Sequence, residues 1–186
     1  MNTGNDPEND KRAERLGSGC MIGKWNAAAG KYRWKGGKPV EIAYQLSGRG
    51  LQEPEVAELS DGRVLVVWRT SGGYKYYSVS DDGGMTLSKP AKWTYDDGSE
   101  FTSPCAYHRM IRHSVTGKLY WVGNPGTNPN KRPLVIAEVD ETKVALKKST
   151  VTMIDDKGPK DGDRLQLSNF CLLENRQTHE LEIYLT

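Results

Sequence analysis

The sequence predicts an all-β protein made of β-propeller blades, roughly three to four blades of an incomplete propeller. Its 186 residues are dominated by short runs that alternate apolar and polar residues and are rich in Val, Ile, Tyr, Trp and Thr. No segment keeps a helical period over three turns. The hairpins signalled by these runs recur at about 45 residues, which is the length of a four-stranded blade. A β-sandwich is the alternative architecture for such a pattern.

Along the chain, a polar segment comes first and the strand signals follow it. Residues 1–15 contain no apolar stretch, so we expect a disordered polar arm there and no signal peptide. Residues 16–186 are expected to form the propeller segment, with antiparallel neighbours because the connections are short. Four stretches are expected to form blades or parts of blades: residues 16–46, 55–90, 105–154 and 165–186.

Composition and charge exclude several classes of partner. The formal net charge is +2 and the basic residues are scattered, whereas a nucleic-acid-binding protein needs a concentrated basic face. No apolar run approaches the length of a membrane span, so we expect a soluble chain without a membrane partner. Cys20, Cys105 and Cys171 form no C-x-x-C pair, which disfavours a zinc site and favours small buried hydrophobic side chains. No metal or cofactor is expected.

The stretch SVSDDGGMTLSKP places four turn-forming residues at alternate positions, Ser80, Asp82, Gly84 and Thr86. Ser and Asp side chains accept hydrogen bonds from nearby backbone N–H groups, Gly tolerates positive φ, and β-branched Thr restarts a strand. The pattern resembles the Asp-box S-x-D-x-G-x-T-W of sialidases and related propellers, with Leu87 in place of Trp. The resemblance implies a six-bladed sialidase-like propeller. It also implies a structural role for the four residues, in a turn between the third and fourth strands of a blade.

Two further segments resemble those that hold the substrate in sialidases. In LQEPEVAELSDGRVLVVWRTSGG, Glu53 opens one strand and Arg69 closes the next, as a glutamate and an arginine do in the family. In KLYWVGNPGTNPNKRPLVIAEVD, Arg132 begins a strand after a loop. The resemblance implies that Glu53 is catalytic, as an acid, a base or a partner of the nucleophile. It implies that Arg69 and Arg132 grip a substrate carboxylate near the propeller axis, a task for which an arginine fork is suited.

Other residues compete with this set or add to it. Two further glutamates, Glu55 and Glu58, are rivals for the catalytic position. Arg109, in the run YHRMIRH at the start of a blade, is expected to be a third substrate-binding arginine. His108 and His113 of the same run fall on opposite faces of a strand, which disfavours shared metal ligation. Either histidine could still hydrogen-bond a glycan or act as a base.

The resemblance covers roughly residues 50–186 and departs from the family at the nucleophile. RLQLSNFCLLEN resembles the segment that supplies a Tyr-Ser-Asp triplet in sialidases. Here Leu167, Ser168 and Asn169 stand in those places, and Tyr184 matches a structural tyrosine instead. The arginine and the acid/base aspartate that the family carries in earlier blades have no counterpart before Gly50.

The resemblance implies a carbohydrate-acting protein of glycoside hydrolase type, with a glycan, anionic or neutral, held by arginines near the axis. A non-catalytic glycan-binding module and a structural propeller module are the alternatives, because the nucleophilic tyrosine and the acid/base aspartate are not found. Whether the full-length protein is an enzyme stays open. The chain alone is expected to be inactive, with missing blades supplied by a longer chain. No compartment is indicated, and the resemblance allows a secreted or periplasmic protein.

Overall fold

The computed structural model describes residues 17–185, and within that range it contains strands and turns but no α-helix. Two short 3-10 turns, Ala27–Ala29 and Lys148–Thr150, are the helical elements among these residues. This confirms the all-β prediction. None of the described helical elements is long and apolar enough to cross a membrane. The polar arm expected at residues 1–15 lies outside the described residues.

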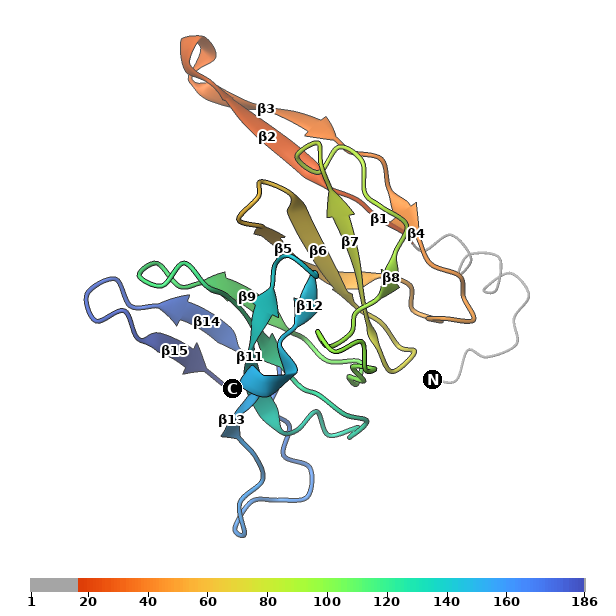
Figure 1. Ribbon diagram of the computed structural model, residues 1–186, viewed down its shortest axis with the longest axis vertical. Helices are drawn as coiled ribbons and strands as arrows, with labels where there is room; N and C mark the ends of the chain where they lie inside the picture. The colour runs from red at the N-terminus through yellow and green to blue at the C-terminus, as the bar shows by residue number, and fades with distance from the viewer. Residues whose placement is uncertain (1–16, 186) are drawn as a thin grey trace.

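The strands are short and follow one another closely in the sequence. Their bounds are β1 (Gly17–Ser18), β2 (Met21–Asn26), β3 (Lys31–Gly36), β4 (Val40–Glu41), β5 (Gln52–Glu58), β6 (Val64–Arg69), β7 (Lys75–Ser80), β8 (Ala91–Lys92), β9 (Arg109–Arg112), β10 (Leu119–Gly123), β11 (Leu134–Asp140), β12 (Ala145–Leu146), β13 (Thr152–Asp155), β14 (Cys171–Glu174) and β15 (Leu181–Tyr184). Figure 1 shows their arrangement.

Two antiparallel sheets form the body of the protein. The first, blade I, has the strand order β5-β6-β7-β8, and the second, blade II, has the order β12-β11-β10-β9 with β13 also paired to β11. Their strands lie within residues 52–92 and 109–155, close to the predicted blades 55–90 and 105–154. Sequence-adjacent strands pair antiparallel in both sheets, as strands joined by short connections do.

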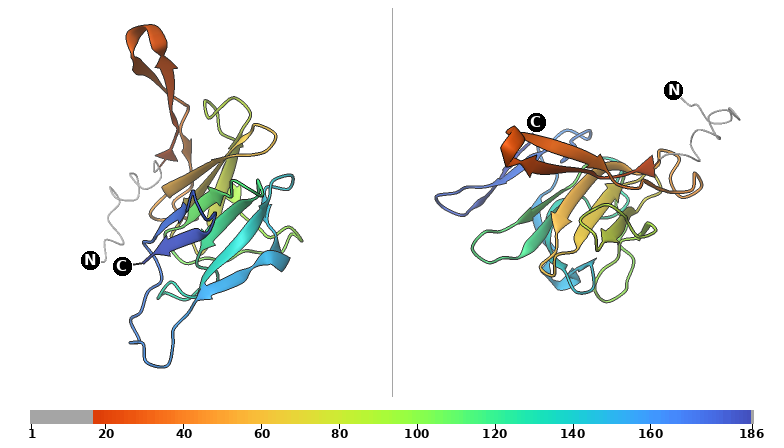
Figure 2. Two further views of the ribbon diagram at one scale, coloured as in Figure 1. Left: turned by 90° about the vertical axis from the view of Figure 1, so that its left-hand side faces the viewer. Right: turned by 90° about the horizontal axis from the view of Figure 1, so that it is seen from above.

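The two remaining predicted stretches form smaller sheets. Within residues 165–186, β14 and β15 make a two-stranded hairpin beside blade II. Within residues 16–46, β2 pairs with β3 and β1 pairs with β4. Figures 1 and 2 show that the β2–β3 hairpin, here called the projecting hairpin (Met21–Gly36), extends away from both blades. These stretches therefore supply two-stranded pieces beside the two larger sheets.

The main core lies between blades I and II. Leu65 and Val67 of β6 point toward three large aromatic side chains, Trp93, Phe101 and Trp121, and all five are fully or almost fully buried. Phe101 meets both tryptophans edge-on, with ring centroids 6.2 Å from Trp93 and 5.1 Å from Trp121. Burial of aromatic side chains is the largest apolar contribution that a sheet interface can receive, so this cluster joins the blades.

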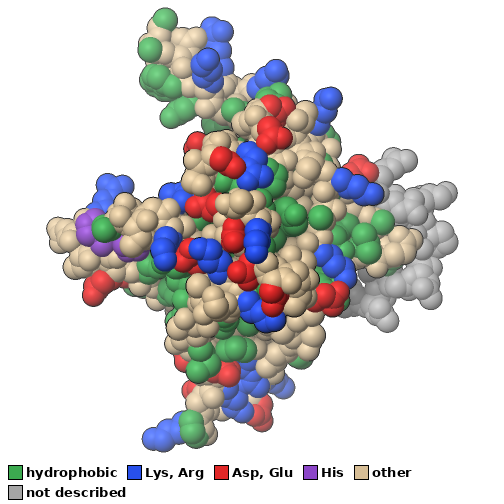
Figure 3. Space-filling model, viewed as in Figure 1, with side chains coloured by type: hydrophobic (Ala, Val, Ile, Leu, Met, Phe, Trp, Pro, Cys, Tyr) green, Lys and Arg blue, Asp and Glu red, His purple; other side chains and the backbone are tan. Residues whose placement is uncertain are grey.

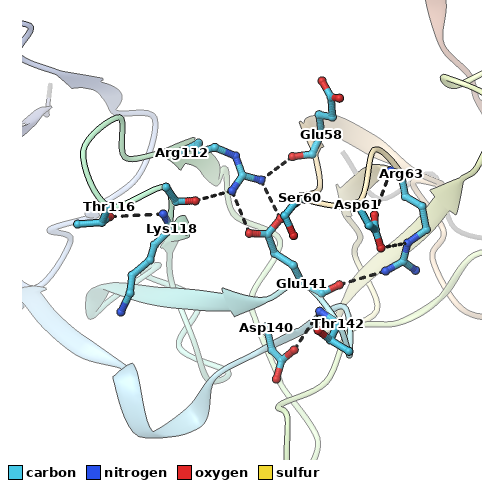
Figure 4. A network of polar contacts seen from close by, with 11 residues as sticks. Glu58, Ser60, Asp61, Arg63, Arg112, Thr116, Lys118, Asp140, Glu141 and Thr142 are labelled. Atoms are coloured by element: carbon cyan, nitrogen blue, oxygen red, sulfur yellow. Dashed lines mark hydrogen bonds and ion pairs between the residues drawn. The ribbon is translucent and has the colours of Figure 1, made fainter.

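A network of polar contacts joins the same two blades at one end of the sheets (Figure 4). The Arg112 guanidinium of β9 donates to both carboxylate oxygens of Glu141 at 2.9 and 2.8 Å, and to the Glu58 carbonyl at 2.6 Å. The Ser60 amide donates to Glu141 Oε2 at 2.6 Å, and Arg63 donates to the Glu141 carbonyl at 3.1 Å. Glu141, just after β11 of blade II, therefore clasps the β5–β6 turn of blade I.

The turn after β7 has the hydrogen bonds expected for a locally folded turn. Ser80 Oγ accepts from the Gly84 amide at 2.8 Å and donates to Asp82 Oδ1 at 2.7 Å. Asp82 accepts from the Thr86 amide at 2.8 Å and from its hydroxyl at 2.7 Å. These bonds, led by that of the Thr86 hydroxyl, lower the pKa of Asp82 to about 2. The turn joins the third and fourth strands of blade I, as predicted.

Replacement of Glu141 by Gln is predicted to weaken the clasp. Hydrogen bonds from Arg112 lower the pKa of Glu141 below its ordinary value. Because the folded-state pKa lies below the unfolded one, this stabilisation is present above the ordinary glutamate pKa and is lost as the pH falls through the folded-state pKa. We expect Glu141→Gln to lower the free energy of unfolding by about 1–2 kcal/mol at neutral pH, measured by chemical denaturation.

The pH dependence distinguishes the charge of Glu141 from its shape. The destabilisation by Glu141→Gln should shrink as the pH falls below the ordinary glutamate pKa. The matched control is Glu41→Gln in β4, which changes an exposed glutamate. A loss of stability of the same size in both variants, or one that does not change with pH, would contradict the assignment.

Candidate functional site

The first strands of blade I, blade II and the β14–β15 hairpin lie side by side, since β5 contacts β9 and β9 contacts β14. An open pocket of about 390 Å³ lies where these strands begin. Glu53 lines it from β5, Tyr107 from the segment before β9, and Asn169, Phe170 and Cys171 from the start of β14. We call it the Glu53 pocket. Blade I, blade II and the β14–β15 hairpin therefore each contribute to the pocket at or just before the start of their first strand.

Glu53 and Arg69 are brought together, as the sequence predicted. Glu53 Oε2 lies 2.8 Å from Arg69 Nη1, and Arg69 Nη2 also donates to Gln52 Oε1 at 3.5 Å. The pairing of β5 with β6 shifts register between Gln52 and Glu55, which is a β-bulge, and Glu53 in the bulge has φ of 47°. Glutamate rarely adopts this left-handed conformation, and such backbone is concentrated at functional sites. The catalytic role of Glu53 stays a prediction.

Arg109 and Glu55 form a second ion pair, which crosses from blade II to blade I. Arg109 Nη1 lies 3.4 Å from Glu55 Oε1 and donates to the Tyr107 hydroxyl at 2.9 Å. Glu55 Oε2 accepts from the Met110 amide at 3.2 Å. Burial raises the pKa of Glu55, against the lowering effects of Met110 and Arg109. Of the two rival glutamates, Glu55 is engaged here, whereas Glu58 belongs to the clasp of Figure 4.

Arg132 lies in the loop between β10 and β11 and does not line the Glu53 pocket. This loop is tied to the segment before β14 by Asn124, a fully buried residue whose side-chain nitrogen donates to the carbonyls of Lys131, Pro133 and Leu167 at 2.7, 3.0 and 2.9 Å. Convergence of Arg132 with Glu53 and Arg69 therefore stays a prediction.

The three arginines share one property. Arg69 Nε, Arg109 Nε and Arg132 Nη1 are each buried without a hydrogen-bond partner among the residues that the structure describes. An unpaired buried donor is unfavourable, and donors of this kind are rare in folded proteins. Each of these atoms is enclosed by the protein, so the unpaired donors lie in the interior and not at the surface of the Glu53 pocket.

Lys75 is a buried cation behind the Glu53 pocket that the sequence reasoning did not single out. Its side chain is fully buried and Nζ donates to the Ala106 carbonyl, which links β7 to the segment that carries Tyr107. Burial is the main cause that lowers the pKa of Lys75 to about 7; nearby Arg69 adds to the lowering, and nearby Glu53 opposes it. One signal was present in the sequence. Lys75, Tyr77 and Val79 occupy every second position of β7 and so share one face, and Tyr77 and Val79 contact the core.

Three other predicted residues occupy different places. His108 is fully buried, and burial, reinforced by nearby Lys75, lowers its pKa well below the ordinary value, so it is neutral and out of reach of a glycan. His113 contacts the His179 carbonyl at 3.0 Å on the exposed β9–β10 turn. Cys171 is exposed and lines the Glu53 pocket, so the expectation that it is buried was wrong. It opens β14 at the pocket, and its side chain is turned outward there.

Tyr107 was also missed, although it precedes the predicted Arg109 by two residues. Its ring packs against Phe170 with centroids 5.6 Å apart, and both residues line the Glu53 pocket. Leu167, where the resemblance expects a nucleophilic tyrosine, is buried in the apolar cluster that contains Phe170 and packs against Tyr107. The tyrosine of the pocket therefore comes from the segment before β9 of blade II. The resemblance to sialidases had placed it in the segment before β14.

Replacement of Lys75 by Met is predicted to have a pH-dependent effect on stability. The folded-state pKa lies below the unfolded value, so the charged form is disfavoured by folding, and this cost diminishes as the pH rises from about 7 toward the unfolded pKa. The stability of the native chain relative to Lys75→Met should therefore rise between pH 6 and pH 9. Denaturation at both pH values measures it, with the exposed Lys89→Met as control. An unchanged difference would contradict the burial-induced shift.

Comparisons with known proteins agree with the fold. No family model matches the chain, and no curated protein matches it. Among solved structures, the chain is similar to NanB sialidase from Streptococcus pneumoniae with a TM-score of 0.58 and 16% identity, over 88% of this chain and 23% of that one. It is also similar to an N-acetylgalactosamine deacetylase from F. plautii, in complex with blood group B trisaccharide, with a TM-score of 0.55 and 12% identity, over 83% and 44% of the two chains.

The similarity favours the propeller over the sandwich alternative. It covers 88% of this chain for the sialidase and 83% for the deacetylase. The chain spans about a quarter of the sialidase and less than half of the deacetylase. At this level of identity the likeness shows the fold alone. The chain has the fold of a sialidase-like β-propeller.

Proposed function

We propose that the chain is the glycan-binding part of a carbohydrate-acting protein, and that the Glu53 pocket with its arginines binds a sugar bearing a carboxylate or sulfate. One observation carries this proposal. Arg69 and Arg109 lie beside the pocket, each paired to one glutamate, and the Arg109 side chain is 41% exposed, so its guanidinium is accessible to a ligand. Carboxylate and sulfate oxygens are the partners that a guanidinium binds best.

The charges beside the pocket support an anionic ligand. Arg69 and Arg109 are each paired to one carboxylate, Glu53 and Glu55, and the buried Lys75 adds a further cation whose nearest charged neighbours include Arg69. Clustered cations repel one another and lose hydration, so they favour an added negative charge. The Glu53 side chain is 40% exposed, which leaves it accessible to a ligand in the pocket.

The solved structures that resemble this chain support a carbohydrate as the class of ligand. One is a sialidase and the other is a deacetylase in complex with a blood group trisaccharide. Both are proteins that act on sugars, although they carry out different reactions. The proposal takes from them the class of ligand, and it takes the preference for an acidic sugar from the arginines of this chain.

Glycoside hydrolysis is the second candidate function, and one observation favours it. Glu53 and Tyr107 line the same pocket, and the Tyr107 hydroxyl lies 2.9 Å from the Arg109 guanidinium. A tyrosine nucleophile suits an anionic sugar because a carboxylate nucleophile would be repelled by it. In this reaction Glu53 would accept the phenolic proton as Tyr107 attacks the anomeric carbon, and the glycosidic C–O bond would break with a proton from water taken up by the leaving oxygen. A second water, deprotonated by a base, would then cleave the glycosyl–tyrosine bond, and Glu53 would return its proton to the phenolate.

Replacement of Arg69 by Ala is predicted to remove the preference for an acidic sugar. The binding of N-acetylneuraminic acid and of its methyl ester would be compared by isothermal titration calorimetry or ligand-observed NMR. The unmodified chain should bind the acid more tightly. Arg69→Ala should weaken that binding by roughly tenfold or more, because a charge-assisted hydrogen bond is lost, and should leave the ester little affected.

The matched control is Arg176→Ala, which removes an exposed arginine in the β14–β15 turn. It should leave both affinities unchanged. Equal binding of the acid and the ester by the unmodified chain would overturn the proposed ligand chemistry. Loss of acid binding in both arginine variants would show that net charge, and not the Glu53 pocket, is responsible.

Turnover of a fluorogenic sialoside tests the second candidate. We expect the chain to release no fluorophore, because Leu167 stands at the family's nucleophile position and is buried. If release is measured, Tyr107→Phe should abolish it, since that change removes the phenolic oxygen alone. Release that survives Tyr107→Phe and is lost in Glu53→Gln would instead assign the nucleophile to Glu53.

A further inference from the structure

The projecting hairpin carries a row of exposed aromatic side chains along one face. In the register of β2 with β3, Trp25 lies opposite Tyr32 and Gly23 opposite Trp34, so the three aromatic side chains share this face. They are 54%, 56% and 63% exposed. Ring centroids lie 5.1 Å apart for Trp25 and Tyr32 and 5.9 Å apart for Tyr32 and Trp34. A contiguous exposed apolar patch of this kind marks an interaction site.

The tip of the hairpin continues the apolar surface. The turn between β2 and β3, residues 26–30, has the sequence NAAAG, bears no charge and exposes its three alanines. The Asn26 side-chain oxygen accepts a hydrogen bond from the Ala29 amide at 3.0 Å, and the Gly30 amide donates to the Ala27 carbonyl at 3.3 Å. An apolar phase offers no partners to backbone amides, so a turn that pairs these amides internally enters such a phase at a lower cost.

Basic side chains occupy the opposite face of the projecting hairpin. Lys24 lies opposite Arg33 in the register, and together with Lys31 and Lys35 they alternate with the aromatic residues. All four are exposed, and residues 17–40 contain no aspartate or glutamate. Figure 3 shows hydrophobic side chains on one side of the hairpin tip and Lys and Arg side chains on the other. The hairpin is therefore amphipathic, with an aromatic face and a basic face.

The hairpin is placed where a flat surface can reach it. It extends away from both blades, and its tip lies at one end of the longest axis of the molecule (Figures 1 and 2). Trp25 ends just before this tip and Tyr32 begins just after it, so both rings adjoin the outermost turn. A surface that approaches along this axis meets the tip before it meets the blades.

Separation of an apolar face from a basic face is the pattern of elements that lie on membranes. In such elements the apolar face enters the interfacial layer, Lys and Arg occupy the polar face, and anionic lipids attract the element as a whole. The attraction acts over a Debye length, so the basic side chains contribute without touching the groups that the aromatic rings contact. Trp and Tyr are also the residues enriched at the membrane–water interface.

The ring geometry disfavours a sugar chain as the ligand of this face. Consecutive sugar rings stack on aromatic rings that share a plane. Here the ring planes are inclined by 66° between Trp25 and Tyr32 and by 37° between Tyr32 and Trp34, so the three rings do not form one flat platform. Insertion among lipid headgroups needs no common plane, because the rings are surrounded by mobile groups.

We propose that the projecting hairpin binds the surface of a lipid bilayer that carries negative charge, with Trp25, Tyr32 and Trp34 in the headgroup layer. The hairpin then lies on the bilayer and does not cross it. The expectation of no membrane partner rested on the lack of a membrane-spanning run, which contact of this kind does not require. The Glu53 pocket is lined by residues of other elements, so lipid binding and sugar binding can be tested separately.

Tryptophan fluorescence with vesicles of phosphatidylcholine, with and without phosphatidylserine, tests the proposal. The chain has five tryptophans, of which Trp68, Trp93 and Trp121 are fully buried, so a change in emission on binding reports on the hairpin. Vesicles that contain phosphatidylserine should shift the emission to shorter wavelength and protect the exposed rings from iodide quenching. Binding to phosphatidylcholine alone should be about tenfold or more weaker, and salt should weaken binding to the anionic vesicles.

Two single variants, measured by vesicle flotation, separate the aromatic face from the basic one. Trp34→Ser removes buried apolar area and should raise the dissociation constant for anionic vesicles about tenfold or more. Lys24→Gln removes one charge and should raise it about fivefold. Both side chains are exposed, so circular dichroism and thermal unfolding should show retained folding.

Matched controls lie at the opposite end of the molecule in Figure 1. Met153→Ser removes an exposed apolar side chain from β13, and Lys160→Gln removes an exposed charge from the β13–β14 loop. Neither should change vesicle binding. A native chain that does not bind anionic vesicles overturns the proposal, as does undiminished binding by Trp34→Ser or an equal loss in Lys24→Gln and Lys160→Gln. Self-association or sugar binding that is lost in Trp34→Ser, in a chain that does not bind vesicles, would assign the face to a protein or a glycan instead.

Discussion

The apolar contact between blades I and II is the interaction on which the rest of the structure depends. Trp93, Phe101 and Trp121 fill the space between the two sheets and set how the sheets lie against each other. With the sheets fixed, Arg109 meets Glu55 across the blade boundary, and the Arg112–Glu141 pair of blade II meets the β5–β6 turn of blade I. Partly exposed ion pairs add little stability, so these pairs chiefly select one arrangement of blades already joined by aromatic burial.

Around the Glu53 pocket, apolar packing and polar chemistry are closely connected. The core that joins the blades also excludes water from Lys75 and His108, and that exclusion lowers the pKa of both side chains. The site thus contains a lysine close to its titration midpoint at neutral pH and a neutral histidine behind two paired arginines. Because Arg69 and Arg109 are each paired with a glutamate, the net charge of the region depends chiefly on whether Lys75 holds its proton.

The features predictable from the sequence are those made by residues close together in the chain. The bonds of Ser80 and Asp82 close within one turn, and Glu53 and Arg69 meet across one hairpin. The alternation of apolar residues likewise revealed blades I and II. Contacts between blades were not predictable, because they depend on how one sheet rotates against the next. The Arg109–Glu55 pair and the exposure of Cys171 belong to that class.

Asn124 gives the region of Arg132 a mechanical property. Its amide nitrogen holds three carbonyl groups, two in the loop that carries Arg132 and one in Leu167, two residues before Asn169 of the Glu53 pocket. The Asn124 amide has two hydrogens for three carbonyl acceptors, so none of its donors is free. The loop that carries Arg132 and the wall of the Glu53 pocket must therefore move together or exchange hydrogen bonds. Arg132 does not line the Glu53 pocket. A ligand that moves Arg132 would nevertheless displace the segment before β14 that lines this pocket, because Asn124 links that segment to the β10–β11 loop.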